Sequence, residues 1–265
     1  MLVFTGITGF ISSKCTFISW QLFLMLVVSL FLAISGTTIF NMIWDRTIDA
    51  KMERTHFRPL PAGEVSIKNS VILGLVLLIS GLALSFYLSI LYGLVIFAGF
   101  FFDFVIYTIW LKRKTAWSVV WGGISGGMPI LAGRVLGTGS IDPIGILLAL
   151  AILLWIPTHI MTLNIRYFSD FNNAGIPTFA SKYGFQNTRI LIAVSSIAST
   201  LAFALGAILL GLSSAFLAML LFIALVFIFV ATVSMYNPDS KINFHLFKLA
   251  SLYMVFVMFI IILGS

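Results

Sequence analysis

Residues 41–63 read NMIWDRTIDAKMERTHFRPLPAG, and they lie where one strongly apolar run has ended and the next has not begun. The chain has eight acidic residues in 265. Three of those eight, together with four basic residues, fall between Asp45 and Arg58. We therefore interpret this segment as the polar mouth of an otherwise apolar helix bundle.

Three oxygen-bearing side chains in this segment, Asn41, Asp45 and Asp49, are spaced i, i+4 and i+8. On a helix this spacing aligns them in one nearly vertical row. Carboxylate and amide oxygens suit Mg²⁺, which keeps several waters while it binds a substrate phosphate. The nearby guanidinium groups suit the remaining phosphate charge. An ordinary cytoplasmic loop would explain the basic residues but not the aligned acids.

The composition excludes a soluble domain. Hydrophobic residues make up 61% of the chain and charged residues 9%, and the mean hydropathy is +1.15. These values predict a polytopic all-α membrane protein. The single cysteine, Cys15, excludes an internal disulfide and a cysteine-built metal site. The net charge of +7 indicates membrane orientation and anionic headgroups, so we expect no nucleic-acid partner.

Apolar stretches bounded by charged or turn residues predict nine helices in one domain over residues 1–265. The first stretch is short for a full crossing. Polar cap segments are expected near residues 45–66 and 164–187. The predicted spans are Leu2–Ser12, Ser19–Trp44, Val71–Leu88, Leu91–Leu111, Trp117–Leu136, Ile144–Thr162, Thr188–Leu210, Ala215–Tyr236 and Phe244–Leu263.

The basic residues predict the orientation of these spans. Thirteen of the 15 follow even-numbered spans, and only Lys14 and Arg134 lie on the other side. The positive-inside bias puts the even-numbered loops and the N-terminus in the cytoplasm and the C-terminus outside, in the plasma membrane. The cytoplasmic side also holds the acids Asp45, Asp49, Glu53, Glu64 and Asp170, so the polar chemistry is expected at one mouth.

A second polar stretch begins near Asn164, half the chain later, and opens on the same side. Pro157 is expected to kink or loosen the preceding helix, which frees backbone groups that usually line a cavity. His159 and Arg166 are seven positions apart and share a helix face. Asp170 is read as a metal ligand or a helix cap, and His159 as a ligand-facing or a buried histidine.

Lys112, Arg113 and Lys114 end the fourth predicted span, where they are a topology signal and also supply cations at the mouth. Asp103 lies deeper on the same helix, with Tyr107 at i+4. An acid at that depth is costly and is functional by default, although it can also bond a neighbouring side chain.

Several motifs then resemble one family. N-x₃-D-x₃-D from Asn41, followed by MERTxxRPLPAG, resembles the first signature of the UbiA superfamily of intramembrane prenyltransferases. YTxxLKRKT from Tyr107, GGxxGGxP from Gly122, WxxxH from Trp155 and DFxxAGIP from Asp170 resemble its protoheme IX farnesyltransferase branch. The resemblance covers about residues 1 to 190.

The resemblance implies nine helices around a central cavity, with a metal–diphosphate site under a cytoplasmic cap. It implies Mg²⁺-dependent transfer of a farnesyl group from farnesyl diphosphate to heme B, which gives heme O, and terminal-oxidase assembly factors as partners. The implied metal and catalytic residues are Asp45, Asp49, Asp170 and Asn41. The implied diphosphate-binding residues are Arg54, Arg58, Lys112, Arg113 and Arg166, and the implied acceptor-binding residues are Trp155, His159, Tyr107 and Asp103.

Two features depart from the family pattern. The second signature normally has two or more acids, but here Asp170 stands alone after Ser169, and Thr158 separates Pro157 from His159. The alternative acceptors are an aromatic quinone precursor and a glycerol-phosphate lipid. A secondary transporter is the alternative from another class, which would favour ionisable groups near mid-membrane and matching halves.

Overall fold

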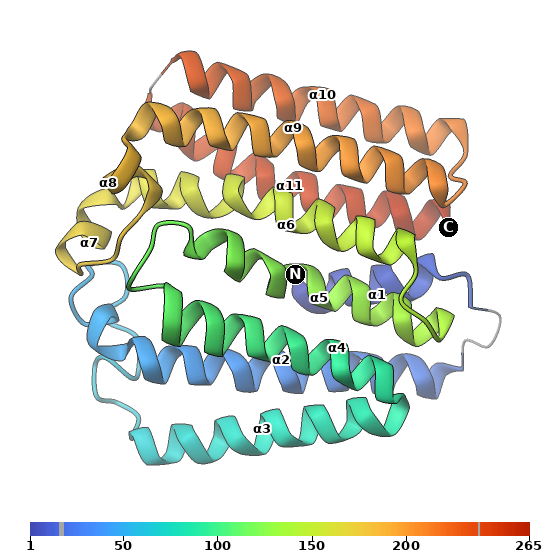
Figure 1. Ribbon diagram of the computed structural model, residues 1–265, viewed down its shortest axis with the longest axis horizontal. Coiled ribbons are helices and arrows are strands. Elements are labelled where there is room, and N and C mark those ends of the chain that lie inside the picture. Colours follow the sequence, from blue (N-terminus) through green and yellow to red (C-terminus); the bar gives the residue numbers. More distant parts are fainter. Residues whose placement is uncertain (16–18, 238) are drawn as a thin grey trace.

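The computed structural model describes residues 1–15, 19–237 and 239–265, in which all regular secondary structure is helical. Figure 1 shows the long helices lying side by side and alternating in direction. The elements are α1 (Leu2–Ser12), α2 (Trp20–Asp49), α3 (Ile67–Leu88), α4 (Ile90–Phe100), the π-helix η1 (Phe101–Leu111), α5 (Ser118–Thr138), α6 (Pro143–Arg166), α7 (Phe168–Asn173), α8 (Phe179–Tyr183), α9 (Phe185–Leu209), α10 (Ser214–Tyr236) and α11 (Ser240–Gly264).

The predicted polytopic all-α fold is confirmed. Within the described ranges, eight helices, with α4 and η1 counted as one, are long and apolar enough to cross a membrane, and α1 is shorter. α2 runs on to Asp49, five residues beyond the predicted span, because the polar row is itself helical. The π-helical turn of η1 was not predicted, since apolar periodicity does not distinguish i+4 from i+5 hydrogen bonding. α6 continues as one helix through Pro157.

The bundle has two apolar cores, one on each side of α5. The first contains residues of α6, α9, α10 and α11, such as Phe203 and Phe227. The second contains residues of α1, α2, α4 and α5, such as Phe10 and Leu30. Outward-facing apolar side chains such as Phe229 remain exposed, as expected of helices that face lipid. The interior next to α5 is where cavities open.

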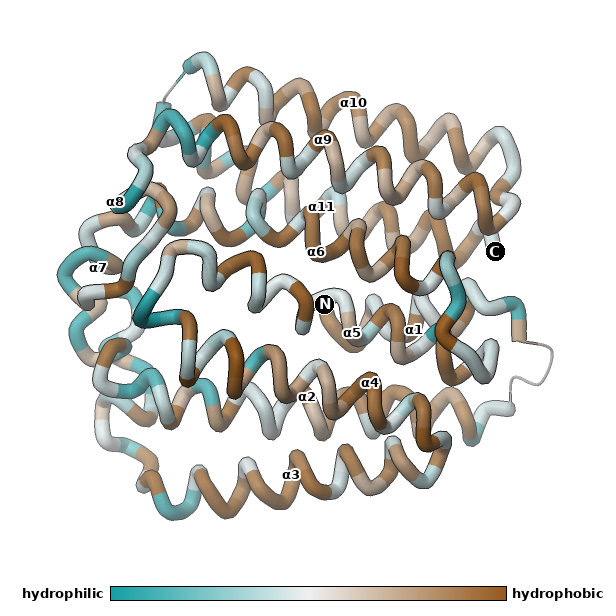
Figure 2. The backbone as a smooth tube through the Cα atoms, in the orientation of Figure 1, coloured by the Kyte–Doolittle hydropathy of each residue, from teal (hydrophilic) through white to brown (hydrophobic). Residues whose placement is uncertain are grey.

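Polar residues gather at one end of the bundle. Figure 2 shows hydrophilic segments at the end that holds α7, α8 and the loop between α2 and α3. The loop from η1 to α5 and the start of α11 lie at this end too (Figure 1). The four loops predicted to be cytoplasmic therefore share one end, which we call the polar mouth, whereas the N-terminus lies midway along the bundle (Figure 1).

An ion pair between buried Arg134 and partly exposed Asp142 joins three helices at the opposite end. Arg134 on α5 donates from Nε to Asp142 at 2.8 Å and from Nη1 to the Ser12 carbonyl of α1 at 2.7 Å. Asp142 also caps α6 by accepting the Gly145 N–H at 2.9 Å. Burial alone would raise the pKa of Asp142, but Arg134 and the Gly145 N–H outweigh it and lower this pKa. One of the two basic residues on this side is thus structural.

We expect Arg134→Met to lower the free energy of unfolding by about 3 kcal/mol, because it leaves buried polar partners unpaired. Because the pKa of Asp142 is lowered in the folded state, the stabilisation is complete above the ordinary carboxyl pKa of about 3.9. It is lost as the pH falls through the lowered value. Thermal unfolding in detergent across pH measures both effects. Lys14→Met, at the exposed basic residue on the same side, is the control and should unfold like the wild type.

Candidate active site

The row of oxygen ligands lies on the last turns of α2, at the polar mouth. Asp45 and Asp49 are 6% and 7% exposed, and each is paired with a basic side chain from outside α2. Lys112 forms a hydrogen-bonded ion pair with Asp45. Arg58 Nη1 donates to Asp49 Oδ2 at 2.9 Å. Each acid of the row is therefore next to a basic group that can also bind an anion.

The π-helix η1 sets the position of Lys112. The Lys112 N–H donates to the Tyr107 carbonyl at 2.8 Å, an i to i−5 bond that continues the π-helical pattern. The ammonium lies 5.6 Å from the centre of the Tyr107 ring. Burial alone would lower the pKa of Lys112, but Tyr107 and Asp45 raise it above its ordinary value. Lys112 is therefore a fixed positive charge at neutral pH.

The second polar segment meets the first at this mouth. Asp170 on α7 is 7% exposed and accepts the backbone N–H of Arg54 at 3.3 Å. Beneath this contact Ile48 and Met52 pack against Ile176, which joins the loop after α2 to the loop after α7. The Arg54 guanidinium lies over the Tyr167 ring at 5.2 Å. The two cap segments expected from the sequence are thus docked onto each other.

The donor set at the mouth fits a divalent cation that is shared with a phosphate ligand. Asn41 Oδ1 and Asp45 Oδ1 are buried without a hydrogen-bond partner in the described part of the chain. Within the same part, no three His, Cys, Asp or Glu side chains are close enough to enclose a metal. Mg²⁺ is usually held by one or two carboxylates plus substrate phosphates and water. Two orphaned oxygens in one row suit that mode of binding.

Asp103 links the mouth to the interior. Asn41 Nδ2 donates to Asp103 Oδ2 at 2.6 Å, and Ser125 Oγ lies 3.4 Å from Asp103 Oδ1. A carboxylate only accepts hydrogen bonds, so it fixes which end of the Asn41 amide turns toward it. The Asn41 oxygen is thereby left for another ligand.

A cavity of about 180 Å³ lies between η1, α5 and α6, and its lining includes Asp103, Tyr107 and His159. The His159 ring is stacked between Trp155 and Phe247, with centroids 4.7 and 4.8 Å away. Trp155 does not line this cavity. Its Nε1 donates to the Ala250 carbonyl at 2.9 Å, so Trp155 holds His159 against α11.

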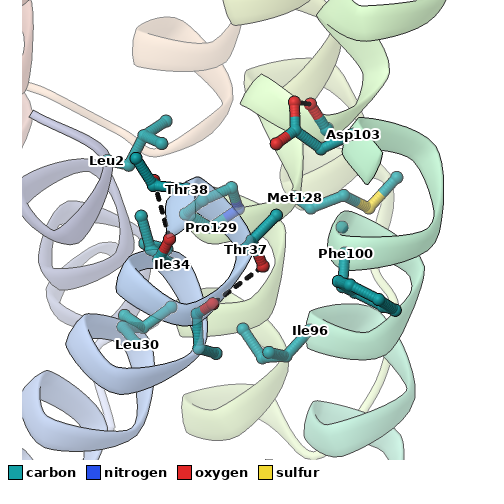
Figure 3. Close-up of a pocket in the computed structure, with 13 residues that line it drawn as sticks. Leu2, Leu30, Ile34, Thr37, Thr38, Ile96, Phe100, Asp103, Met128 and Pro129 are labelled. Atoms are coloured by element: carbon teal, nitrogen blue, oxygen red, sulfur yellow. Dashed lines mark hydrogen bonds between the residues drawn. The ribbon is translucent and has the colours of Figure 1, made fainter. Parts of the chain in front are cut away.

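A second cavity of about 90 Å³ is lined mostly by apolar residues, and Figure 3 shows Leu30, Ile96 and Phe100 around it. The hydroxyls of Thr37 and Thr38 are bonded to carbonyls of their own helix, so they add little polarity. Asp103 and Ser125 line both cavities. The two cavities therefore meet beside the carboxylate that bonds Asn41.

Two other cations predicted for the diphosphate lie in different surroundings. Arg113 Nη2 donates to the Trp44 carbonyl at 2.9 Å and lies 4.0 Å from Asp45 Oδ1. Arg166 instead lies over the Phe244 ring of α11 at 3.7 Å, and its described contacts include none of the acids of the mouth. Its assignment to the diphosphate stays a prediction.

Residues of α11 and Ser125 were missed by sequence reasoning. Phe247 and Ser251 contact His159, with Ser251 Oγ 3.3 Å from Nδ1. No local pattern marks an aromatic or a serine in an apolar span as a site residue. The i, i+4 spacing of Phe247 and Ser251 was the one available signal, and it is equally typical of a packed helix face.

The fold and the site together define a polytopic membrane protein in which charged groups at one mouth open onto buried apolar cavities. Such a site suits a substrate with an anionic head and an apolar tail. The model of the UbiA prenyltransferase family matches residues 2–257, and the chain belongs to that family.

Relatives and solved structures agree with this placement. The chain is 39% identical over 222 residues to a protoheme IX farnesyltransferase of Pyrobaculum islandicum, which covers 82% of this chain and 80% of the relative. It is 38% identical over 242 residues to a protoheme IX farnesyltransferase of Archaeoglobus fulgidus, and the match covers 91% of this chain and 86% of the relative.

Two solved structures share the fold. One comes from work on digeranylgeranylglyceryl phosphate synthase in membranes. It matches with a TM-score of 0.82 at 21% identity, over 99% of this chain and 92% of that one. A UbiA homolog from Archaeoglobus fulgidus bound to DMAPP and Mg²⁺ matches with a TM-score of 0.73 at 14% identity, over 98% and 95%.

We expect Mg²⁺ to raise the unfolding temperature of the wild-type protein, because a ligand of the native state stabilises it by about 2.7 kcal/mol at 100 times its Kd. Asp45→Asn should lose most of this Mg²⁺-dependent shift. Glu64→Gln, at an exposed acid of the loop after α2, should keep it. A full shift in Asp45→Asn would contradict the placement of the cation.

Proposed function

We propose that this intramembrane prenyltransferase transfers the farnesyl group of farnesyl diphosphate to heme B and so forms heme O. The acceptor and the donor are supported by the names of the relatives that are 38–39% identical over most of the chain. The observation that carries the chemistry is the row of acids on α2 interleaved with Lys112 and Arg58 above an apolar interior.

Asp45 and Asp49, with Asn41, would bind Mg²⁺ together with diphosphate oxygens, and the orphaned oxygens of Asn41 and Asp45 support this assignment. Asp170 would contribute from α7 only once the diphosphate is bound, because no three acids of the described residues enclose an ion by themselves. When bound, the ion neutralises diphosphate charge as the leaving group departs. Arg54, Arg58, Lys112 and Arg113 would bind the remaining diphosphate oxygens. Lys112 and Arg58 already lie against the acids of the row, so they can reach a diphosphate that binds beside these acids.

The residues of the mouth favour cleavage of the allylic C–O bond because they stabilise the negative charge that develops on the diphosphate. The farnesyl chain would lie along the apolar cavity that contains Leu30, Ile96 and Phe100. Those side chains exclude water from the allylic cation until the acceptor attacks.

The acceptor would approach from the cavity that contains Tyr107, His159 and Asp103. A vinyl carbon of heme B attacks C1 of the farnesyl cation and forms a carbon–carbon bond. Hydroxide from water adds to the resulting cation beside the porphyrin ring, and the proton is released. The overall product is a hydroxyethylfarnesyl side chain, with diphosphate as the leaving group.

The orientation in the membrane is part of the same proposal. The polar mouth would face the cytoplasm of a plasma membrane, because the segments that gather there hold 13 of the 15 basic residues. Association with terminal-oxidase assembly factors remains a prediction from the resemblance alone.

Product analysis tests the proposed reaction. The purified protein is given Mg²⁺, farnesyl diphosphate and one acceptor: heme B, an aromatic quinone precursor or a glycerol-phosphate lipid. Mass spectrometry should find a farnesylated product, heme O, with heme B and no farnesylated product with the other two acceptors. Product formed only with another acceptor would overturn the heme assignment. Transport of a substrate without chemical conversion would overturn prenyl transfer itself.

We expect Asp103 to act by orienting Asn41, and an exchange of the two side chains tests this role. Asp103→Leu should raise the Mg²⁺ concentration for half-maximal activity about tenfold or more, because the Asn41 amide is no longer held. Asn41→Asp should also impair the enzyme by placing two carboxylates together. The double variant with Asp103→Asn reverses donor and acceptor, keeps one free oxygen at position 41, and should recover activity. An unchanged Mg²⁺ requirement in Asp103→Leu would contradict this role.

A further inference from the structure

A second polar site, separate from the acid row, opens at the mouth between the end of α6 and the start of α11. This cleft has a volume of about 550 Å³. Its polar lining consists of Arg166, Tyr167, Lys241, Asn243 and His245, with no carboxylate among the lining residues. We call it the α6–α11 cleft. Its charge and its walls point to an anionic ligand with a flat face.

Arg166 of the cleft and the neighbouring Lys248 lie over an aromatic ring and not beside an acid. Arg166 lies 3.7 Å and Lys248 4.6 Å from the centre of the Phe244 ring. None of the ion pairs in the described part of the chain involves Arg166, Lys241 or Lys248. The nearby Asp239 accepts the backbone N–H of Lys241 at 2.9 Å. These exposed cations are therefore available to an anionic ligand.

A ladder of stacked rings leads from the cleft into the bundle. Phe244 is nearly parallel to Phe247, with 13° between planes and centroids 6.1 Å apart. Phe247 stacks on His159, which stacks on Trp155. His159 and Arg166 are seven positions apart on α6, which is about 10 Å along the helix. The ladder therefore joins the cationic cleft to the cavity beside Asp103.

We propose that the α6–α11 cleft binds the carboxylates of a flat, apolar dicarboxylic acceptor, so that Arg166 and Lys241 pair with its acid edge. The proposal rests on the proposed function, in which the acceptor is heme B, a planar ring with two propionates on one edge. The opposite edge would reach past His159 toward the allylic carbon. The ring would lie along the edges of the ladder, because the faces of His159 are already stacked on Trp155 and Phe247.

This assignment gives the diphosphate and the carboxylates of the acceptor separate binding sites at the mouth. The diphosphate has the acids of α2 and α7 beside its cations, and those acids suit a bridging divalent metal. The α6–α11 cleft offers cations and an amide without lining carboxylates, which suits a carboxylate bound without metal. Arg166 then serves the acceptor and not the diphosphate.

The test is a binding titration of the full-length protein in nanodiscs of neutral lipid without prenyl diphosphate, followed by absorbance. The ligands are heme B and its dimethyl ester, which keeps the ring and removes the charges. Arg166→Gln combined with Lys241→Gln should weaken heme B binding about tenfold or more, and the ester should bind both proteins equally. Lys182→Gln, an exposed cation of α8 at the same mouth, should bind like the wild type.

Kinetics give an independent readout. The double variant should raise the KM for heme B and leave the KM for farnesyl diphosphate unchanged. The proposal is overturned if the ester binds the wild type as tightly as the diacid. It is also overturned if the variant binds heme B like the wild type in neutral lipid and differs from it only when the titration is repeated in nanodiscs that contain anionic lipid. Should the wild type bind heme B through this cleft but prenylate another acceptor, the proposed function fails and the carboxylate site stands.

Discussion

The pairing of buried acids with cations at the membrane mouth is the constraint on which the rest of the structure depends. Asp45 and Asp49 sit at the end of a long apolar helix, where an uncompensated charge would be costly. Lys112 comes from η1 and Arg58 from the loop after α2, so the charge balance requires these segments to converge. The convergence that neutralises the two carboxylates also brings together the cations to which we assign the diphosphate.

Two cavities lie beneath this mouth, and the carboxylate of Asp103 lines both of them. Asp103 borders the apolar cavity on the side of α1, α2 and α4, and it borders the cavity of His159 on the side of α6. Its bond to Asn41 connects both cavities to the row above. A donor tail and an acceptor ring could thus meet beneath the same oxygen ligands, with water excluded from the point of reaction.

Large parts of this arrangement were predictable because they depend on local sequence. Apolar run lengths gave the spans to within a few residues, since a crossing requires about 20 apolar residues. The i, i+4, i+8 spacing put Asn41, Asp45 and Asp49 on one face of α2, and the motifs around them indicated the family later matched over residues 2–257. The π-helix η1 was not predicted, because hydrophobic patterns do not encode its hydrogen bonds.

What the sequence by itself determined is the set of helices, the polar ends and the acids that share a face, because each follows from helix geometry or hydropathy. Only the tertiary structure decided which partner each polar group meets. Asn41 bonds Asp103, 62 positions away, and Asp170 meets the Arg54 backbone across 116 positions. Arg166, grouped with the diphosphate cations from sequence, stacks on Phe244 of α11 instead. Such contacts arise from helix packing, and no local periodicity specifies them.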